Sequence, residues 1–542
     1  MTSIGKIFSS NIESGAVRNT RELKRILELP QRDALELGEI IAECLTHAIK
    51  TPNGTMTLRP LQATALAESH DLNGSLIFLP VGEGKTLISY LLPTVMAKEK
   101  PLLLVPGKLL GKTRKEFSEL SKHWTKPENL EIRSYEKLST TPTLLNDLNP
   151  DLIIADECFK LKSKKAGCTK RIHRYWHKKE ELAFVAMSGT MTKRSYMDWW
   201  HLQLWALPDP LLVLPIGYKE CEMWSEAFDE KLKIRRPIGA LNAFGDNLDE
   251  ARKGYGRHLR QVPGIISAEG NNVASSLYID EVRLDSSIIQ DTIKQMEKTW
   301  TLPDGTEFCE AIELHRHSCE LSQGFYYRWV EQPPEEWAIA RSQCNIFVRE
   351  ILRHSRTYET PAQIFDAYQN EHMVDRWLRI RGTFKPKTEP VWMDHSFIYN
   401  SVNRLEGDDC LIWTEFRAVG REIEKQFKIP YFHSHGKTSS GLSIYDHTGP
   451  AVVSVAAVGE GFNLQKWNSN YVLSSPASGT TWEQMLGRTH RQGQEADTVN
   501  VEVLISADVQ RRNFKQAKQD AEYIQAITGQ RQKLCYADYL GD

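Results

Sequence analysis

Short apolar runs bounded by turn residues recur along the chain in two separate groups. The first group comprises "SLIFLP" (75–80), "PLLLVP" (101–106), "DLIIAD" (151–156) and "LAFVAMS" (182–188). The second comprises "CLIWTEF" (410–416), "AVVSVAAV" (451–458), "YVLSSP" (471–476) and "TVNVEVLI" (498–505). Runs of this length that alternate with helical stretches are typical of buried strands in a parallel sheet with helices on both faces. The sequence therefore predicts an α/β fold with two parallel-sheet units.

The region between the two groups lacks this alternation and contains long polar helical stretches such as "WVEQPPEEWAIA". A chain of 542 residues is too long for a single hydrophobic core. We expect five segments: a helical N-terminal segment (1–50), a first α/β unit (51–205), a mostly helical region (206–390), a second α/β unit (391–515) and a helical C-terminal tail (516–542).

The composition and the N-terminal sequence argue against a membrane-spanning protein and against a secreted protein held by disulfides. No apolar run reaches the roughly 18 residues of a membrane span, and the N-terminus, "MTSIGKIFSSNIES", lacks the apolar core of a secretory signal. The nine cysteines include no CxxC pair, which favours a reducing compartment. We therefore expect a cytoplasmic protein without a membrane partner. The compact chain with few accessory modules suggests a bacterial or viral origin (in the host cytoplasm if viral). The net charge is −2, so any contact with nucleic acid must come from a local basic patch.

Two cysteines and two histidines lie close together in "FCEAIELHRHSCELSQ" and raise the question of a zinc site: Cys309, His315, His317 and Cys319. The stretch has the pattern of a helix, and its spacing matches no common zinc finger. We therefore expect a helix here.

A glycine-rich stretch, "LPVGEGKTLISY", joins the first apolar run to a helical pattern. Gly82 and Gly84 let the backbone wrap around phosphates, and the following helix presents its first N–H groups. Lys85 would reach the β- and γ-phosphates, and the hydroxyl of Thr86 would ligate Mg²⁺. The strict phosphate-loop pattern needs glycine where this chain has Leu79, so a glycine-rich turn with an incidental lysine is the alternative.

An acidic pair, Asp156–Glu157, ends the apolar run "LIIAD". The carboxyl edge of a parallel sheet is where such folds bind ligands. Asp156 would hold Mg²⁺, and Glu157 would orient and deprotonate an attacking water molecule. An isolated Asp–Glu pair is usually a solvated turn. Its position at a strand end, about 70 residues after the Gly-Lys-Thr loop, favours the catalytic interpretation.

With these motifs the chain resembles the superfamily-two helicases and, among them, the SWI/SNF-like DNA translocases. The resemblance covers about 58–205 and 395–505, with the motifs in family order: "LRPLQ" (58–62), "LLLVPGKLL" (102–110), "SYEKLS" (134–139), "MSGT" (187–190), "LIWTEFRAVG" (411–420), "GEGFNLQ" (459–465) and "EQMLGRTHRQGQ" (483–494). It implies two RecA-like P-loop NTPase lobes, with ATP and Mg²⁺ as ligands. One departure is the short stretch between "HSHG" (433–436) and "AVVSVAAV", where the family usually has a helix.

The resemblance also implies roles for individual residues. It implies that the nucleotide is contacted by Arg59, Gln62, Glu83, Gly459 and Gly461, and that Ser188 and Thr190 couple hydrolysis to movement. It implies nucleic-acid contacts by Lys108 and Asn463, and it identifies the arginine fingers as Arg488 and Arg491. The two arginines are spaced i, i+3, which predicts one shared helix face. Such an arginine contributes about 10³–10⁵ in rate in known nucleotide hydrolases. The alternative for an RxxR pair is a solvated helix face.

A basic run, "KLKSKKAGCTKRIHRYWHKK" (160–179), follows the acidic pair and holds nine Lys or Arg and no Asp or Glu. We expect phosphate contacts from Lys164, Lys165, Lys170 and Arg171. The alternative is a solvated surface. Tyr175 and Trp176 either stack on bases or pack the helix against its unit.

The sequence thus predicts an ATP-dependent nucleic-acid motor, most simply a DNA-stimulated ATPase that translocates on duplex DNA, with single strands as a further possibility. Alternatives are a strand-separating DNA or RNA helicase, and a nucleotide-gated binding module with weak hydrolysis. A small-molecule kinase would leave the second unit unexplained. A protein partner could bind through 1–50 or 206–390.

Overall fold

The computed structural model describes residues 15–540 except for 33–35, 81, 165, 180, 190–191, 193–194, 230–235, 269–272, 285, 307, 309–310, 355–357, 359–360, 386, 406–408 and 459–460. The chain forms two compact units. Unit 1 is Met1–Asn271 with Gln519–Cys535, and unit 2 is Asn272–Lys518 with Tyr536–Asp542. Each unit is built on its own parallel sheet, as the apolar runs predict.

The sheet of unit 1 has the strand order β3-β2-β4-β5-β1-β6, and every pairing in it is parallel. Its strands are β1 (Gly74–Phe78), β2 (Pro101–Val105), β3 (Glu131–Ser134), β4 (Leu152–Asp156), β5 (Ala183–Ser188) and β6 (Ile265–Ser267). The four strands expected from the first group of apolar runs, β1, β2, β4 and β5, are confirmed.

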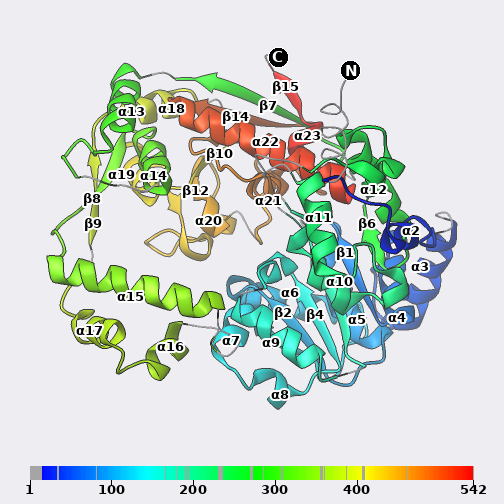
Figure 1. Cartoon of the computed structure of the whole chain (residues 1–542). Helices are drawn as coiled ribbons and strands as arrows, with labels where there is room; N and C mark the ends of the chain where they lie inside the picture. The colour runs from blue at the N-terminus through cyan, green and yellow to red at the C-terminus, as the bar shows by residue number, and fades with distance from the viewer. Residues whose placement is uncertain are drawn as a thin grey trace, which may run out of the picture. The chain divides into compact units, whose positions relative to one another are not determined.

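Two apolar clusters cover the two faces of this sheet. Leu76 and Phe78 belong to one cluster and Ile77 to the other, because successive side chains of a strand point to opposite faces. On the Ile77 side pack α3 (Glu36–Ile49), α4 (Pro60–Asp71), α5 (Lys85–Val95) and α6 (Leu110–Leu120). The other side is covered by α2 (Arg21–Leu27), α7 (Tyr135–Thr140), α8 (Leu144–Leu148), α9 (Gly167–Trp176), α10 (Trp200–Ala206), α11 (Tyr218–Phe228), α12 (Leu248–Gln261) and the end of α22 (Asp508–Thr528). Figure 1 shows these elements around β1, β2 and β4.

The sheet of unit 2 has the order β11-β12-β10-β13-β14-β7-β15 and is again parallel throughout. Its strands are β7 (Ser276–Arg283), β10 (Cys410–Thr414), β11 (Tyr431–Phe432), β12 (Ala451–Ser454), β13 (Ser469–Val472), β14 (Thr498–Ile505) and β15 (Asp538–Leu540). The second group of apolar runs is confirmed as strands. The run at 451–458 is a strand only to Ser454 and continues as α20 (Val455–Val458).

Besides the helices within residues 330–387, unit 2 contains α13 (Ser287–Thr299), α14 (Ala311–Leu321), α18 (Ser396–Asn403), α19 (Arg417–Phe427), α20, α21 (Gly479–Thr489) and the start of α22. Residues 433–450, all of them described, contain no α-helix: between β11 and β12 they form the short 3-10 turns Ser434–Gly436 and Ile444–Asp446 and an isolated bridge between Lys437 and Ser443. This connection is as short as the sequence indicates.

The region 206–390 is more than a helical connection, and this expectation needs correction. It supplies β6 to the first sheet and β7 to the second, where β7 pairs with β14 over eight residues. It also forms an antiparallel hairpin from β8 (Phe325–Trp329) and β9 (Thr388–Trp392). The alternating pattern of β7, "SLYIDEVR", buries only every second side chain near its start and gives no continuous apolar run.

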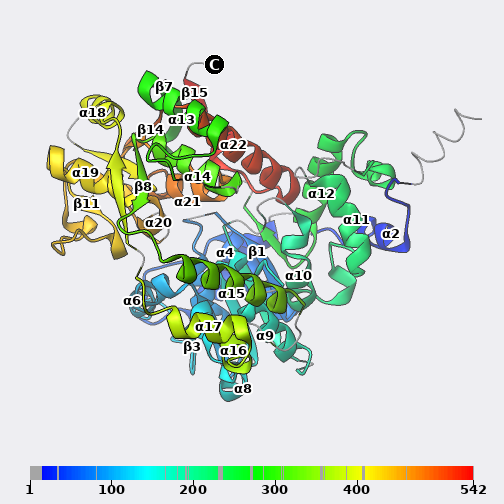
Figure 2. The same cartoon turned by 60° about the vertical axis from the view of Figure 1, so that its left-hand side comes forward.

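A small group of helices lies between β8 and β9, and we call residues 330–387 the helical insert. It contains α15 (Glu335–His354), α16 (Pro361–Ala367) and α17 (His372–Ile380), with α15 lying across the other two (Figure 2). Its own apolar cluster includes Cys344, Val348, Ile364 and Val374. The insert therefore has a core separate from that of the sheet.

No helix in the described part of the chain has the length and apolar character needed to cross a membrane. Of the cysteine–histidine group, Cys309 lies outside the described residues, and the stretch after it forms α14 as expected. The Nδ1 atom of His317 lies 2.9 Å from a carboxylate oxygen of Glu320. Among the described residues no three His, Cys, Asp or Glu side chains gather as a metal site.

Candidate functional site

The loop between β1 and α5 forms a cradle at the carboxyl edge of the first sheet. Gly82 and Gly84 have φ angles of +98° and +85°, a region that residues with a Cβ seldom adopt. A Cβ on Gly84 would lie less than 3.0 Å from Nε2 of Gln62. α5 begins directly after Gly84, so its first N–H groups have no partner within the helix. The loop is therefore shaped to receive an anion.

Lys85 supplies a cation in this cradle. Its Nζ donates to the carbonyl oxygens of Leu79 at 2.7 Å and Pro80 at 3.2 Å. A Cβ built on Gly189 would lie 3.7 Å from the same Nζ. The ammonium group thus lies between the loop and the residue that follows β5.

The acidic pair stands at the end of β4, beside β5. Glu157 has a φ angle of +52°, an uncommon conformation for a residue other than glycine and one that is concentrated at functional sites. Its N–H donates to Oδ1 of Asp156 at 3.0 Å, and its carboxylate accepts from the hydroxyl of Ser188 at 3.3 Å. Burial, followed by the Glu157 charge, raises the pKa of Asp156 above its usual range, while Lys85 acts in the opposite direction.

The side chains at this sheet edge can be compared with those that a nucleotide and Mg²⁺ require. The structure brings Lys85, Asp156, Glu157 and Ser188 together at one sheet edge, next to a loop that only glycine fits. Carboxylate and hydroxyl oxygens are the ligands that Mg²⁺ prefers. A bound cation would also favour the ionised form of Asp156. The donor set therefore fits.

The residues expected on the adenine side contact the same loop. Gln62 donates from Nε2 to the carbonyl of Glu83 at 3.2 Å and accepts from the N–H of Arg59 at 3.1 Å. The guanidinium of Arg59 forms an ion pair with Glu83 at 2.9 Å. Arg59 precedes α4 as its N-cap. The start of α4 thus holds the loop from one side.

In unit 2, Arg488 and Arg491 both contact the motif "GEGFNLQ" (459–465). Nη1 of Arg488 donates to the carbonyl of Phe462 at 3.2 Å, and Nη1 of Arg491 donates to Oδ1 of Asn463. Gly461 has a φ angle of +82°, while Gly459 lies outside the described residues. The expectation that both arginines share a helix face is wrong, because α21 ends at Thr489 and Arg491 lies beyond it.

The basic run does not present all its cations to solvent. The Nζ of Lys164 lies 3.8 Å from the ring centroids of both Trp200 and Tyr218, and burial lowers its pKa to about 8. Arg171 is only 6% exposed and donates to the carbonyl of Leu138. These placements argue against phosphate contact by Lys164 and Arg171, because both cations are occupied inside unit 1.

The other residues of the predicted nucleic-acid surface differ in exposure. Lys170 on α9 is partly exposed, and Lys108, in the 3-10 turn after β2, is exposed. Tyr175 is buried and donates to the carbonyl of Pro150 at 3.0 Å, so it packs the helix against its unit. Lys165 and Thr190 lie outside the described residues.

Two contacts to this site were not anticipated from the sequence. Gln530, which is fully buried, donates from Nε2 to the carbonyl of Gly189. Tyr135 donates from its hydroxyl to the carbonyl of Asp156 at 2.7 Å. Tyr135 lies in the "SYEKLS" motif, so the sequence did mark its neighbourhood as part of a site. No sequence pattern connects Gln530 with a residue more than 300 positions earlier.

No protein family and no curated protein matches this chain by sequence. A solved structure of a Sulfolobus solfataricus SWI2/SNF2 ATPase core in complex with dsDNA is similar, with a TM-score of 0.33 and 16% identity, over 84% of this chain and 89% of that chain. The fold is given by the two sheets themselves: the protein is an α/β protein with two RecA-like units, each a parallel sheet flanked by helices.

Proposed function

We propose that this protein is a DNA-stimulated ATPase that translocates along duplex DNA. One observation carries the proposal: Lys85, the Asp156–Glu157 pair and Ser188 meet at one edge of the sheet, beside a left-handed glycine turn. Such an edge is where parallel sheets bind ligands. The order of the family-like motifs along the chain supports the same activity.

Each residue at this edge has a physical role in the proposal. Arg59 and Gln62 hold the base side of the nucleotide, and Lys85 with the first N–H groups of α5 binds its phosphates. Thr86 and Asp156 hold Mg²⁺, which when bound supplies positive charge that offsets charge developing on the phosphates.

Glu157 accepts a proton from the attacking water. The hydroxyl of Ser188, at 3.3 Å, orients that carboxylate. Because β5 carries Ser188 at its last position, a shift of this strand end would move Glu157. This gives a route by which nucleic-acid binding at neighbouring motifs changes the rate of hydrolysis.

In unit 2 we propose Arg491 rather than Arg488 as the principal arginine finger. Arg488 is only 4% exposed and donates to two backbone carbonyls, of Gln484 at 2.9 Å and Phe462 at 3.2 Å. Arg491 is partly exposed and contacts the exposed Asn463. A partly exposed guanidinium is more accessible to a phosphate than a buried one. For nucleic-acid contact we propose Lys108, Lys170 and Asn463.

The first experiment measures steady-state ATPase activity with and without duplex DNA. Lys85→Ala and Glu157→Gln should each lower turnover by at least about 10²-fold, in line with the rates contributed by such groups, while duplex binding stays within about twofold. Lys98→Ala and Glu119→Gln are matched controls, because Lys98 contacts Asn73 and Glu119 contacts Lys122 on exposed surface. Near-normal turnover in either site variant would refute the active-site assignment.

A panel of nucleic acids then separates translocation from the alternatives. Stimulation by duplex together with triplex displacement supports the translocase. Stimulation only by RNA or single strands, with rapid unwinding of a fork, identifies a strand-separating helicase. Tight binding gated by ATP without appreciable hydrolysis identifies the nucleotide-gated module, although the presence of both Lys85 and Glu157 speaks against it.

A further inference from the structure

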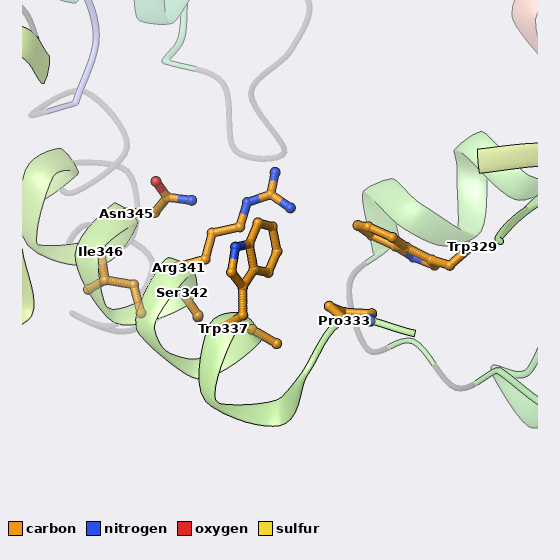
Figure 3. Close-up of a pocket in the computed structure, with 8 residues that line it drawn as sticks. Trp329, Pro333, Trp337, Arg341, Ser342, Asn345 and Ile346 are labelled. Carbon is orange, nitrogen blue, oxygen red and sulfur yellow. The ribbon is translucent and has the colours of Figure 1, made fainter. Parts of the chain in front are cut away.

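The helical insert carries an open pocket of about 310 Å³ (Figure 3). It is lined by Trp329, Pro333, Trp337, Ala338, Arg341, Ser342, Asn345 and Ile346. All of these residues belong to unit 2. The pocket is separate from the glycine loop of β1 and α5, and none of the roles proposed above uses it.

One face of α15 forms most of the pocket wall. The six lining residues of this helix follow the spacing i, i+1, i+4, i+5, i+8, i+9, which places them on one side of a helix. Trp337 and Arg341 stand beside each other on that side, and Trp329 lies across from them at the end of β8 (Figure 3). The wall is therefore built from regular elements rather than from loops.

The aromatic floor of the pocket is held in place by neighbouring rings. The ring centroid of Trp337 lies 5.2 Å from those of both Trp377 and Phe384, in edge-to-face contacts. Phe384 also contacts Trp329, with 6.2 Å between centroids. Trp337 is 4% exposed, whereas Trp329 is partly exposed. A planar ligand would meet a preformed apolar surface with one accessible indole.

The polar groups of the pocket are cationic or neutral. The guanidinium carbon of Arg341 lies 5.3 Å from the Trp337 ring centroid, and Arg341, Ser342 and Asn345 are exposed. The lining contains no Asp or Glu. Arginine beside an aromatic ring is a common arrangement for stacking on nucleobases, while hydroxyl and amide groups can bond to base edges.

A basic segment adjoins the pocket. Residues 376–387, "RWLRIRGTFKPK", hold five Lys or Arg and no Asp or Glu. The indole N–H of Trp337 donates to the carbonyl of Arg381 at 3.4 Å, so this segment passes directly beside the floor. Arg376 and Arg379 contact the carboxylates of Glu336 and Asp375. Arg381, Lys385 and Lys387 are exposed, as are Glu331, Glu335 and Glu336 next to the lining residues, of which Glu336 pairs with Arg376.

We propose that this pocket binds an unpaired base of a nucleic-acid strand, with the strand's phosphates along Arg381, Lys385 and Lys387. A volume near 300 Å³ is at the lower end for small-molecule pockets and suits one base with part of its sugar. Proline-rich peptides also bind aromatic grooves, but the Arg341 guanidinium in the lining and the exposed cations of the segment 376–387 favour an anionic polymer. The inference goes beyond the motor function and can be tested without ATP.

The test compares a fluorescent dT strand with the same strand carrying abasic positions, using the full chain without nucleotide. Both strands have the same phosphates, so the ratio of their Kd values isolates the contribution of the bases. We expect the wild-type protein to bind the dT strand about 10-fold more tightly, equivalent to about 1.4 kcal/mol and within the range of base stacking on aromatic side chains. Equal affinity for the two strands would overturn the proposal.

Three variants locate the effect. Trp329→Ala and Arg341→Ala should each reduce the ratio to about twofold or less. Arg328→Ala is the matched control and should retain the ratio, because Arg328 neighbours Trp329 on β8 but pairs with Glu389 at 2.7 Å and points to the other face of the strand. An unchanged ratio in both pocket variants would place the base contact elsewhere and refute the proposal.

Two further measurements separate this proposal from others. Lys85→Ala should keep the dT-to-abasic ratio even though it abolishes ATPase activity, so failure of the proposed motor function leaves the pocket assignment intact. A proline-rich peptide should not displace the dT strand. Displacement by the peptide that is lost in Trp329→Ala would overturn the nucleic-acid assignment in favour of a peptide site.

Discussion

Replacing Gly84 by alanine perturbs the proposed phosphate cradle at its most constrained position. The residue has φ +85° and ψ +28° and is the N-cap of α5. An added Cβ would lie less than 3.0 Å from Nε2 of Gln62 and 3.3 Å from Nη2 of Arg59. Gly84→Ala therefore strains the backbone and also displaces the residues that hold the loop.

Two contributions set the expected magnitude. An L-residue in the left-handed region costs about 1–2 kcal/mol. Displacing Gln62 breaks its 3.2 Å bond to the Glu83 carbonyl, and Gln62 is only 5% exposed, so leaving its amide unpaired costs about 1–3 kcal/mol. Together they destabilise the loop by about 2–5 kcal/mol, which corresponds to a roughly 30- to 4,000-fold increase in local opening.

Hydrogen exchange at the start of α5 is the direct assay. The amide of Ile88 donates to the carbonyl of Gly84 at 3.1 Å, so a peptide containing Ile88 reports on this turn. We expect its exchange to accelerate by about 10²-fold and ATP binding to weaken. Exchange within about twofold of wild type, with unchanged ATP affinity, would refute the cradle geometry.

Two other glycines separate the contributions. Gly305 has the same φ of +85° with no atom within 4 Å of an added Cβ, so Gly305→Ala should show the backbone cost alone, about 1–2 kcal/mol. Gly111 in α6 also has open space and no positive φ. Gly111→Ala should stabilise its helix by about 0.5–1 kcal/mol.

Four further substitutions test the proposed machinery. Arg491→Ala should lower kcat by at least about 10²-fold with little change in KM, because a finger acts on the transition state; a defect confined to KM would make it an ordinary binding group. Lys170→Gln should reduce the log–log salt slope of duplex binding by about 0.9, whereas Lys164→Gln should not, since its ammonium lies between two rings; equal slopes for both variants and wild type would remove α9 from the DNA surface. Gln530→Ala should lower kcat about fivefold, the equivalent of one hydrogen bond, through its lost contact with Gly189; unchanged kcat would leave Gln530 a packing residue only.

The central strands and the glycine loop could be predicted because their signals are local. Strands such as β2 and β4 are continuous apolar runs, since both of their faces are buried. The Gly-Lys-Thr loop and the Asp–Glu pair each occupy a few consecutive positions, so their chemistry is visible without knowledge of the fold.

The missed elements depend on distant parts of the chain. β7 carries Asp280, Glu281 and Arg283 in its second half and becomes a strand by pairing with β14, more than 200 residues later. β6 is only three residues long and completes the first sheet beside β1. The local sequence pattern could not distinguish β6 and β7 from the helical stretches around them. A strand is stabilised by packing against the strands beside it as much as by its own sequence.

The basic run shows the same limit for side chains. Its nine cations were evident from the sequence, but Lys164 folds between Trp200 and Tyr218 and Arg171 folds onto the Leu138 carbonyl. The sequence gives the positions of the basic residues along the chain. It does not show which aromatic rings and carbonyl groups the fold brings within contact distance of them.

By itself, the sequence determined the α/β class and the two groups of strands and predicted the residues that we propose bind nucleotide, because apolar runs and short motifs act through neighbouring positions. The tertiary structure decided which strands join each sheet, how Ser188 and Gln530 reach the site, and that Trp329 and Trp337 form a pocket. Those arrangements require residues far apart in the chain to be brought together, and the burial of apolar surface that brings them together is a property of the whole fold.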